Sequence, residues 1–231
     1  MNSEKHINIA IDGPGGAGKS TVAKEVARRL GIAYLDTGAM YRGIGYKCLK
    51  EAVDPTDAAA VGALLERTGL KVEYVGTEQR IILDGEDVTP FIREYAVSKA
   101  ASDASAIPAV RLKLVALQRE IAAEHSVVLD GRDIGTYVLP GARYKFFLTA
   151  REEVRAKRRH DELAAKGSDI GFDKVLQDMR IRDANDSQRD FAPLKQAADA
   201  VLIDSSDMCI DDVVEAVVTA VKQPRQSSLG I

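Results

Sequence analysis

A glycine-rich segment near the N-terminus carries the residue types that bind phosphate. The segment is Gly13-Pro14-Gly15-Gly16-Ala17-Gly18-Lys19-Ser20-Thr21, and it contains the pattern G-x-x-x-x-G-K-S. Glycines allow the backbone to curl so that its N–H groups point inward around phosphate oxygens. Lys19 can reach the β- and γ-phosphates of a nucleoside triphosphate, and the Ser20 hydroxyl can take one position on magnesium. The motif predicts nucleotide binding but does not identify a reaction.

Asp130 is the candidate second ligand for magnesium. It ends the apolar run Val127-Val128-Leu129, which is typical of a buried strand. In a doubly wound sheet, ligands sit at the carboxyl ends of the strands. Asp130 can therefore hold the metal through water, or it can be an ordinary turn residue before Gly131. The sequence leaves both readings open.

Other segments carry side chains suited to a second anionic ligand. A hydroxyl, a phenol and a guanidinium follow the second predicted strand, and an Arg-Asp pair follows Asp130. A later predicted helix carries two arginines and an aspartate at positions i, i+4 and i+7, which lie on one face of a helix. Arginine is preferred where phosphate needs a planar, bidentate partner. These residues are Thr37, Tyr41, Arg42, Arg132, Asp133, Arg182, Asp186 and Arg189.

Each of these side chains also has a simpler interpretation. Arg182 and Asp186 can form a surface i,i+4 ion pair, and Tyr41 can be a core residue. Arg155, Arg158 and Arg159 can form a solvated helix face. The functional interpretation is favoured because separate arginine-bearing segments follow strands or flank one charged helical pair.

The elements that must position these residues alternate between strand and helix. Such alternation predicts a parallel sheet covered on both faces. A helix start is expected at Asp54-Pro55, with Asp54 as the cap and Pro55 as the first helical residue. Strands are expected at 7–12, 33–35, 127–130, 144–148 and 200–204; helices are expected after Gly18, at 39–50, from Pro108 onward, and as a charged pair at 151–166 and 172–189.

A small antiparallel patch interrupts this alternation. Two strand-like runs, 71–75 and 79–83, precede Asp84-Gly85, a dipeptide that favours a tight hairpin turn. Residues 65–100 are therefore expected to form an inserted subdomain, and residues 1–64 and 101–231 the core, with a lid at about 151–170.

Composition narrows the classes of protein. The chain has 231 residues and a formal net charge of -3, which argues against binding a nucleic-acid polymer. No apolar stretch approaches the ~18 residues of a membrane span, and Met1–His6 lacks the apolar core of a signal peptide. Two lone cysteines, Cys48 and Cys209, fit a reducing cytoplasm. A monomer is the default expectation.

Four segments together resemble the bacterial cytidylate kinase family, over nearly the whole chain. The segment 131–136, Gly-Arg-Asp-Ile-Gly-Thr, is far more specific than the phosphate-binding motif. The matching segments are Asp12 to Thr21, Asp36-Thr37-Gly38-Ala39-Met40-Tyr41-Arg42, Asp130 to Thr136, and Ala192-Pro193-Leu194.

The resemblance implies an α/β P-loop kinase core with five parallel strands flanked by helices, an antiparallel monophosphate-binding insert and a mobile helical lid. It implies that Thr37, Arg42, Arg132 and Arg189 hold the acceptor phosphate, with Tyr41 nearby. It further implies that Ser102, Arg111 and Asp133 read the cytosine, and that Arg182 and Asp186 touch the ribose. Residues 13–21 and Arg158 would bind ATP, and Lys19, Arg132 and Arg189 would be catalytic.

The expected reaction is transfer of the γ-phosphoryl group of ATP to CMP, and to dCMP, with Mg²⁺ bound by Ser20 and Asp130. A rival enzyme class is a shikimate-type kinase for a small hydroxylated metabolite, with Asp36 or Asp133 as base. A rival from another class is a nucleotide-switch module, which would hydrolyse slowly and have no phosphoryl acceptor.

Overall fold

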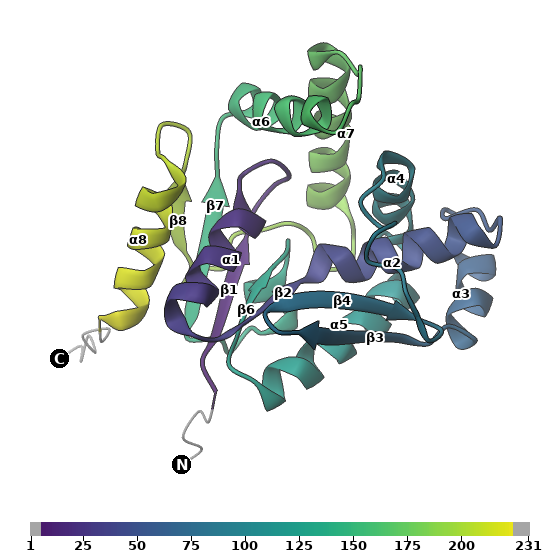
Figure 1. The fold of residues 1–231 in the computed structure, drawn as a ribbon, viewed down its shortest axis with the longest axis horizontal. Coiled ribbons are helices and arrows are strands. Elements are labelled where there is room, and N and C mark those ends of the chain that lie inside the picture. Colours follow the sequence, from purple (N-terminus) through teal and green to yellow (C-terminus); the bar gives the residue numbers. More distant parts are fainter. Residues whose placement is uncertain (1–5, 224–231) are drawn as a thin grey trace.

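A five-stranded parallel sheet forms the centre of the molecule in this computed structural model, which describes residues 6–223 (Figure 1). The strand order is β2-β6-β1-β7-β8, and all four pairings are parallel. The expected parallel sheet is therefore confirmed. The strands are β1 (Asn8–Asp12), β2 (Ala33–Asp36), β6 (Val127–Asp130), β7 (Tyr144–Thr149) and β8 (Val201–Asp204).

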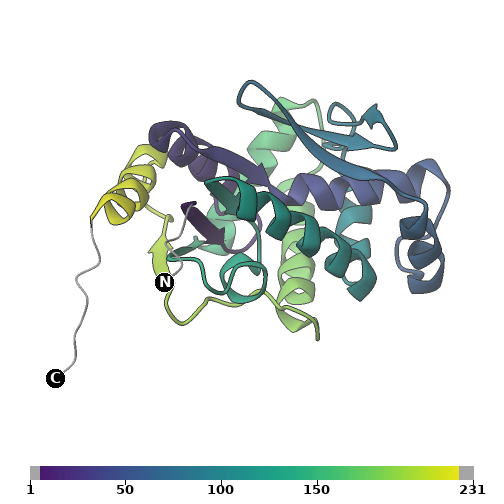
Figure 2. The ribbon, with the colours of Figure 1, turned by 90° about the horizontal axis from the view of Figure 1, so that it is seen from below.

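Helices cover both faces of this sheet. Alternate residues of a strand point to opposite faces, so Ile9 and Ile11 pack with α1 (Lys19–Leu30) and α8 (Ile210–Lys222) on one face. Ala10 packs on the other face, with α2 (Thr37–Lys50), α3 (Ala58–Glu66) and α5 (Pro108–Glu124). Figure 2 shows α1 in purple beside α8 in yellow. The carboxyl ends of the strands stay uncovered by these helices, which leaves room for a site there.

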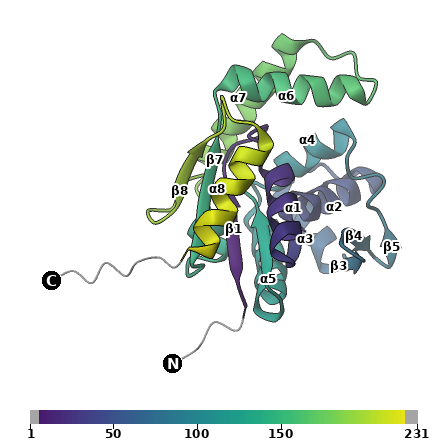
Figure 3. The same ribbon diagram turned by 60° about the vertical axis from the view of Figure 1, so that its left-hand side comes forward.

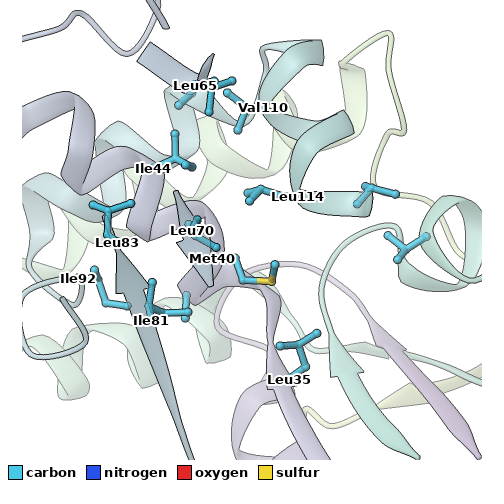
Figure 4. Close-up of a cluster of buried hydrophobic side chains, with 14 of the residues drawn as sticks. Leu35, Met40, Ile44, Leu65, Leu70, Ile81, Leu83, Ile92, Val110 and Leu114 are labelled. Atoms are coloured by element: carbon cyan, nitrogen blue, oxygen red, sulfur yellow. The ribbon is translucent and has the colours of Figure 1, made fainter. Parts of the chain in front are cut away.

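The inserted sheet is antiparallel, as the sequence predicts, and it shares the core of the larger sheet. It consists of β3 (Leu70–Val75), β4 (Glu78–Leu83) and β5 (Glu86–Asp87). Asp84 and Gly85 both adopt positive φ, 52° and 88°, the conformation that a tight hairpin turn requires. Figure 4 shows Leu70, Ile81 and Leu83 of this sheet packed beside Met40 and Ile44 of α2.

Side chains, not a strand ladder, join the inserted sheet to the edge of the parallel sheet. The amide of Gln79 accepts a hydrogen bond from the backbone N–H of Asp36 (2.7 Å) and donates one to its carbonyl (3.2 Å). The Tyr74 hydroxyl donates to the carbonyl of Tyr34 across 3.0 Å. These bonds fix the inserted sheet over the end of β2.

Two helices form a charged pair above the carboxyl ends of the strands (Figure 3). They are α6 (Glu152–Ala165) and α7 (Phe172–Gln188), which confirms the predicted pair within a few residues. Gly167, with φ of 82°, lies between them. The helix pair is placed where it can cover a ligand bound at the sheet edge.

The helix expected to begin at Asp54 starts later than predicted. α3 begins at Ala58, and Asp57 caps it by accepting hydrogen bonds from the backbone N–H groups of Ala59 and Ala60. Asp54 instead accepts from the N–H and the hydroxyl of Thr56. The Asp-Pro pair therefore forms a turn ahead of the helix, because a second Asp closer to the apolar run takes the capping role.

Three helices were not predicted: α4 (Tyr95–Ala104), α8, and a short π-helix at Ile134–Val138. The π-helix begins beside Asp12 at the end of β1. The Asp12 carboxylate accepts hydrogen bonds from the backbone N–H groups of Ile134 (2.8 Å) and Gly135 (2.7 Å). Burial raises the pKa of Asp12 to about 6, although these two bonds act to lower it. Asp12 thus fixes the segment that follows Asp133.

Candidate active site

The glycine-rich segment folds as a tight loop between β1 and α1. Gly13 has φ of 142°, and a Cβ there would lie 1.9 Å from the carbonyl oxygen of Leu148, so no other residue fits without moving β7. Gly18 caps α1 with φ of 88°. Lys19 and Ser20 consequently occupy the first turn of α1, where unpaired N–H groups and the helix dipole favour an anion.

The Lys19 side chain is buried beneath this loop. Its Nζ donates a hydrogen bond to the carbonyl oxygen of Pro14 across 2.7 Å, and the residue is 6% exposed. Burial lowers the pKa of the Lys19 ammonium group, and the neighbouring Arg132 lowers it further. The carboxylates of Asp130 and Asp12 act to raise this pKa but do not offset the effect of burial.

Asp130 collects hydrogen bonds from three elements. Its carboxylate accepts from the hydroxyl of Ser20 (2.7 Å) and from that of Tyr34 (3.0 Å), and its main-chain carbonyl accepts from the hydroxyl of Thr37 (2.6 Å). Burial raises the pKa of Asp130, as does the negative charge of Asp36. These bonds bring Ser20, Tyr34 and Asp130 together in an oxygen-lined corner near Lys19.

A second cluster pairs arginines with carboxylates on the opposite side. Nε of Arg132 donates to Oδ2 of Asp186 across 2.9 Å. A nitrogen of Arg111 lies 2.5 Å from Oδ2 of Asp133, and a nitrogen of Arg189 lies 3.5 Å from Oδ1 of the same residue. Burial acts to raise the pKa of Asp186, but the positive charges of Arg132 and Arg182 outweigh it and hold that pKa below its ordinary value.

Tyr41 and Arg42 extend this cluster from the first turns of α2. Arg42 donates to Oδ2 of Asp36 across 2.8 Å. The guanidinium of Arg111 lies 5.6 Å from the centre of the Tyr41 ring, within range of a cation–π contact. Burial raises the pKa of Tyr41 to about 12. Tyr41 also packs against the core, as the simpler interpretation expects, and it lines the cleft described next.

One cleft, with a volume of about 1680 Å³, joins the loop to the arginine cluster. Every site residue predicted from the sequence lines it except Gly13 and Pro14, which lie in the turn beneath. Ser102 reaches the cleft from α4 and Asp133 from the segment after β6. Arg182 is more open than the arginines paired with Asp36 and Asp133 and than Arg132, with its side chain 44% exposed and its Nε 4.0 Å from Asp186.

The three arginines of α6 have different environments. Arg155 is 5% exposed and hydrogen-bonds the loop carbonyl of Gly15, so the solvated-face reading is wrong for it. Arg158 donates to the hydroxyl and carbonyl oxygens of Ser205 at 3.1 and 2.7 Å. Arg159 pairs with Glu162 on the same helix. Arg158 and Arg159 line the cleft.

Gln118 is a cleft residue that the sequence reasoning missed. It is 1% exposed, and neither amide atom has a hydrogen-bond partner within the protein. It lies one turn after Leu114 on α5, beside the apolar stripe. A polar residue on the buried face of an amphipathic helix was the available signal. Arg93 and Lys166 also line the cleft and carried no such signal.

Comparison with known proteins finds relatives that are similar to this chain over almost its full length. A family model described as "Cytidylate kinase" matches residues 9–223. A cytidylate kinase of Caldicellulosiruptor bescii is 50% identical over 213 residues, which cover 92% of this chain and 94% of that protein. One of Shouchella clausii is 48% identical over 219 residues, covering 95% and 97%.

A solved structure shares the fold alone. A crystal structure of an uncharacterised protein from Eubacterium ventriosum superposes with a TM-score of 0.50 at 13% identity, covering 95% of this chain and all of that one.

Within residues 6–223, none of the helices combines the length and the apolar character that a bilayer span requires.

Proposed function

Because this chain belongs to the cytidylate kinase family, we propose that it transfers the γ-phosphoryl group of ATP to CMP, giving ADP and CDP. The observation that carries this proposal is that one continuous cleft has the glycine-rich loop at one end and the paired arginines at the other. Two anionic nucleotides can meet in it end to end. The same site would take dCMP, which differs only at the ribose.

The donor nucleotide occupies the loop end in this proposal. Residues 13–21 surround its phosphates, with Lys19 on the β- and γ-phosphates, and Arg158 lies nearby on α6. Lys19 would exchange its bond to Pro14 for a phosphate oxygen. Such an exchange restores a full ionic partner to a buried ammonium group, so it favours binding of the triphosphate.

Magnesium fits the corner formed by Ser20 and Asp130. Two oxygen-bearing side chains are already 2.7 Å apart there, and oxygen is the ligand that Mg²⁺ prefers. Among the described residues no group of three or more His, Cys, Asp or Glu could hold a metal. That suits Mg²⁺ in phosphoryl transfer, because it keeps several waters and takes its remaining ligands from substrate phosphates. The ion would neutralise charge on the transferring group.

The acceptor nucleotide occupies the arginine end. Thr37, Arg42, Arg132 and Arg189 hold its phosphate in this proposal, with Tyr41 alongside. Ser102, Arg111 and Asp133 face its base, and Arg182 and Asp186 its ribose. The Thr37 hydroxyl now donates to the carbonyl of Asp130, so it must rotate to donate to a phosphate.

The chemistry requires positioning and charge neutralisation, not a general base. The attacking phosphate oxygen of CMP is already ionised near neutral pH. Lys19, Arg132 and Arg189 would stabilise the charge that spreads over the transferring group. Residues 151–170 would cover the cleft as a lid, and exclude water that would otherwise accept the phosphoryl group.

The two rival readings are less compatible with these contacts. A small hydroxylated acceptor needs a base, but the candidate bases Asp36 and Asp133 are each held by arginine. A nucleotide switch needs no acceptor site, and it leaves the paired arginines without a role.

We extend the proposal to the organisation of the chain. Residues 65–100 form the acceptor-binding insert, and residues 1–64 and 101–231 the core. One chain acts alone, because it supplies both ends of the cleft. A cytoplasmic location suits its two free thiols, Cys48 and Cys209.

Coupled measurement of ADP release tests the function. The full chain with ATP and Mg²⁺ is offered CMP, dCMP, UMP, AMP or shikimate, and the Lys19→Met variant controls for contaminating kinases. Fastest release with CMP supports the proposal. Slow release that no acceptor accelerates would favour the switch, and acceleration by shikimate alone would favour the small-metabolite kinase.

A further inference from the structure

The loop that would cradle the donor phosphates is held from outside by side chains. For its N–H groups to point inward, its carbonyl groups must point away from the phosphate. The carbonyl of Gly15 accepts a hydrogen bond of 3.0 Å from Arg155. The carbonyl of Ala17 lies 3.3 Å from the hydroxyl of Ser205, which shares its one proton with the carbonyl of Thr149 at 3.0 Å. Arg155 and Ser205 come from elements far along the chain.

Arg155 is held by protein groups through two of its three guanidinium nitrogens, Nε and NH1. Its Nε donates to the carbonyl of Ala150 at 2.9 Å, and its NH1 donates both to Gly15 and to Oδ2 of Asp183 at 2.6 Å. The guanidinium therefore joins three elements: the end of β7, the loop, and α7. A planar side chain with five fixed donors is suited to holding such partners at set angles.

The helix that Arg155 grips also carries residues of the acceptor end. Asp183 lies one turn before Asp186, which accepts the hydrogen bond from Arg132, and α7 ends one residue before Arg189. Contacts therefore run without a break from the Gly15 carbonyl, through Arg155 and Asp183, along one helix to the paired arginines. A change at either end shifts a shared rigid element.

We propose that Arg155 is a positioning residue that couples the two ends of the cleft, so that acceptor binding at α7 tightens donor binding at the loop. The inference rests on the proposed function. Acceptor phosphate would draw Arg132 and Arg189 and set the position of α7, and Arg155 would transmit that position to the Gly15 carbonyl. By linkage, the donor tightens the acceptor by the same factor.

Equilibrium binding of a non-hydrolysable ATP analogue, with and without saturating CMP, measures this coupling directly. We expect CMP to strengthen analogue binding to the full wild-type chain by at least ~5-fold, the lower end of typical coupling. Arg155→Lys keeps the charge but loses the bidentate geometry, and Asp183→Asn leaves the Arg155–Gly15 contact in place while weakening its link to α7. In both variants the ratio of analogue affinities with and without CMP should fall to about one, the value expected when the two sites are not coupled.

Arg180→Met is the matched control. Arg180 pairs with Glu152 at 2.8 Å and so joins the same two helices, but on an exposed side and without touching the loop. This variant should keep the wild-type factor. A merely structural role for Arg155 would lower thermal stability without changing the factor, so melting temperatures are measured in parallel.

Three results would overturn the inference. The first is that CMP does not change binding of the ATP analogue to the wild-type chain. The second is that Arg155→Lys and Asp183→Asn keep the wild-type coupling factor. The third is that Arg180→Met loses the coupling factor as fully as the Arg155 variant does. If the Arg155→Lys variant does not fold, the result for Asp183→Asn is the deciding test. Failure of the wild-type chain to bind CMP at all is a different outcome, since it would overturn the proposed function itself.

Discussion

The hydroxyl of Ser20 donates a 2.7 Å hydrogen bond to the carboxylate of Asp130, although 110 positions separate the two residues. The bond joins the first turn of α1 to the end of β6. The structure therefore holds two oxygen-bearing side chains, of the kind that Mg²⁺ prefers as ligands, side by side.

Replacing Asp130 by Asn tests this corner. The change keeps the shape of the side chain but removes its charge, so the Mg²⁺ concentration for half-maximal activity should rise roughly 10–100-fold, the usual effect of losing a group that supports a metal. Activity is titrated with Mg²⁺ at saturating ATP and CMP. Tyr34→Phe removes a different bond to the same carboxylate and should change the requirement little. Equal effects of both variants would contradict the metal assignment.

Lys19→Met should lower turnover far more than it weakens CMP binding. The residue is buried, and methionine fills a similar volume without the ammonium group. Loss of a group that stabilises transition-state charge costs about 10²–10³ in kcat. Steady-state kinetics give kcat and the KM for CMP separately. Undiminished turnover would place the loop away from the chemistry.

Gln118→Met should separate stability from acceptor binding. Removing a buried amide that has no partner within the protein should raise the free energy of unfolding by about 1 kcal/mol. If this amide serves the bound acceptor, the KM for CMP rises while the KM for ATP stays constant. Urea unfolding and initial-rate kinetics provide the two measurements. Lower stability with an unchanged KM for CMP would show that the amide is a core-packing group only.

Asp12 should make one contribution to stability that declines as pH rises. Burial lifts its pKa from 3.8 to about 6, so the folded chain holds this proton more tightly than the unfolded chain between those pH values. The stability it contributes is fully present below pH 3.8 and is lost as pH rises through 6. About 2 pH units correspond to roughly 3 kcal/mol at most.

The difference in unfolding free energy between wild type and Asp12→Asn isolates this contribution, because other carboxylates titrate alike in both chains. We expect the difference to shift against the wild type from pH 4 to pH 6 and to level off above. A difference that stays constant across this window would show that Asp12 titrates normally.

The succession of strands and helices along the core could be predicted because its signals are local, and most residues singled out at the strand ends do line one cleft. The run 7–12, the glycines and Lys19-Ser20 announce a strand, a loop and a helix in succession, and Asp130 ends an apolar run. The acceptor nucleotide was predicted from the family resemblance alone, because the spacing of residues does not indicate which base a site binds.

The remaining features depend on contacts between distant segments. The π-helix at Ile134–Val138 exists beside a carboxylate of β1, which no local pattern reveals. Arg155 has the sequence appearance of a surface residue on a basic helix, yet its partners Gly15 and Asp183 come from elsewhere in the chain. The helix start was predicted at Asp54, but α3 begins at Ala58 with Asp57 as its cap, because the Asp-Pro motif also suits a turn ahead of a helix.

The side-chain bonds that join Gln79 and Tyr74 to β2 also affect how this molecule meets its neighbours in solution. β2 is the outermost strand on its side of the sheet, and such a strand can recruit a strand from another copy and start aggregation. The outward main-chain groups of Tyr34 and Asp36 named above are already occupied. This border of the sheet is therefore closed to strand exchange by the same insert that serves the cleft.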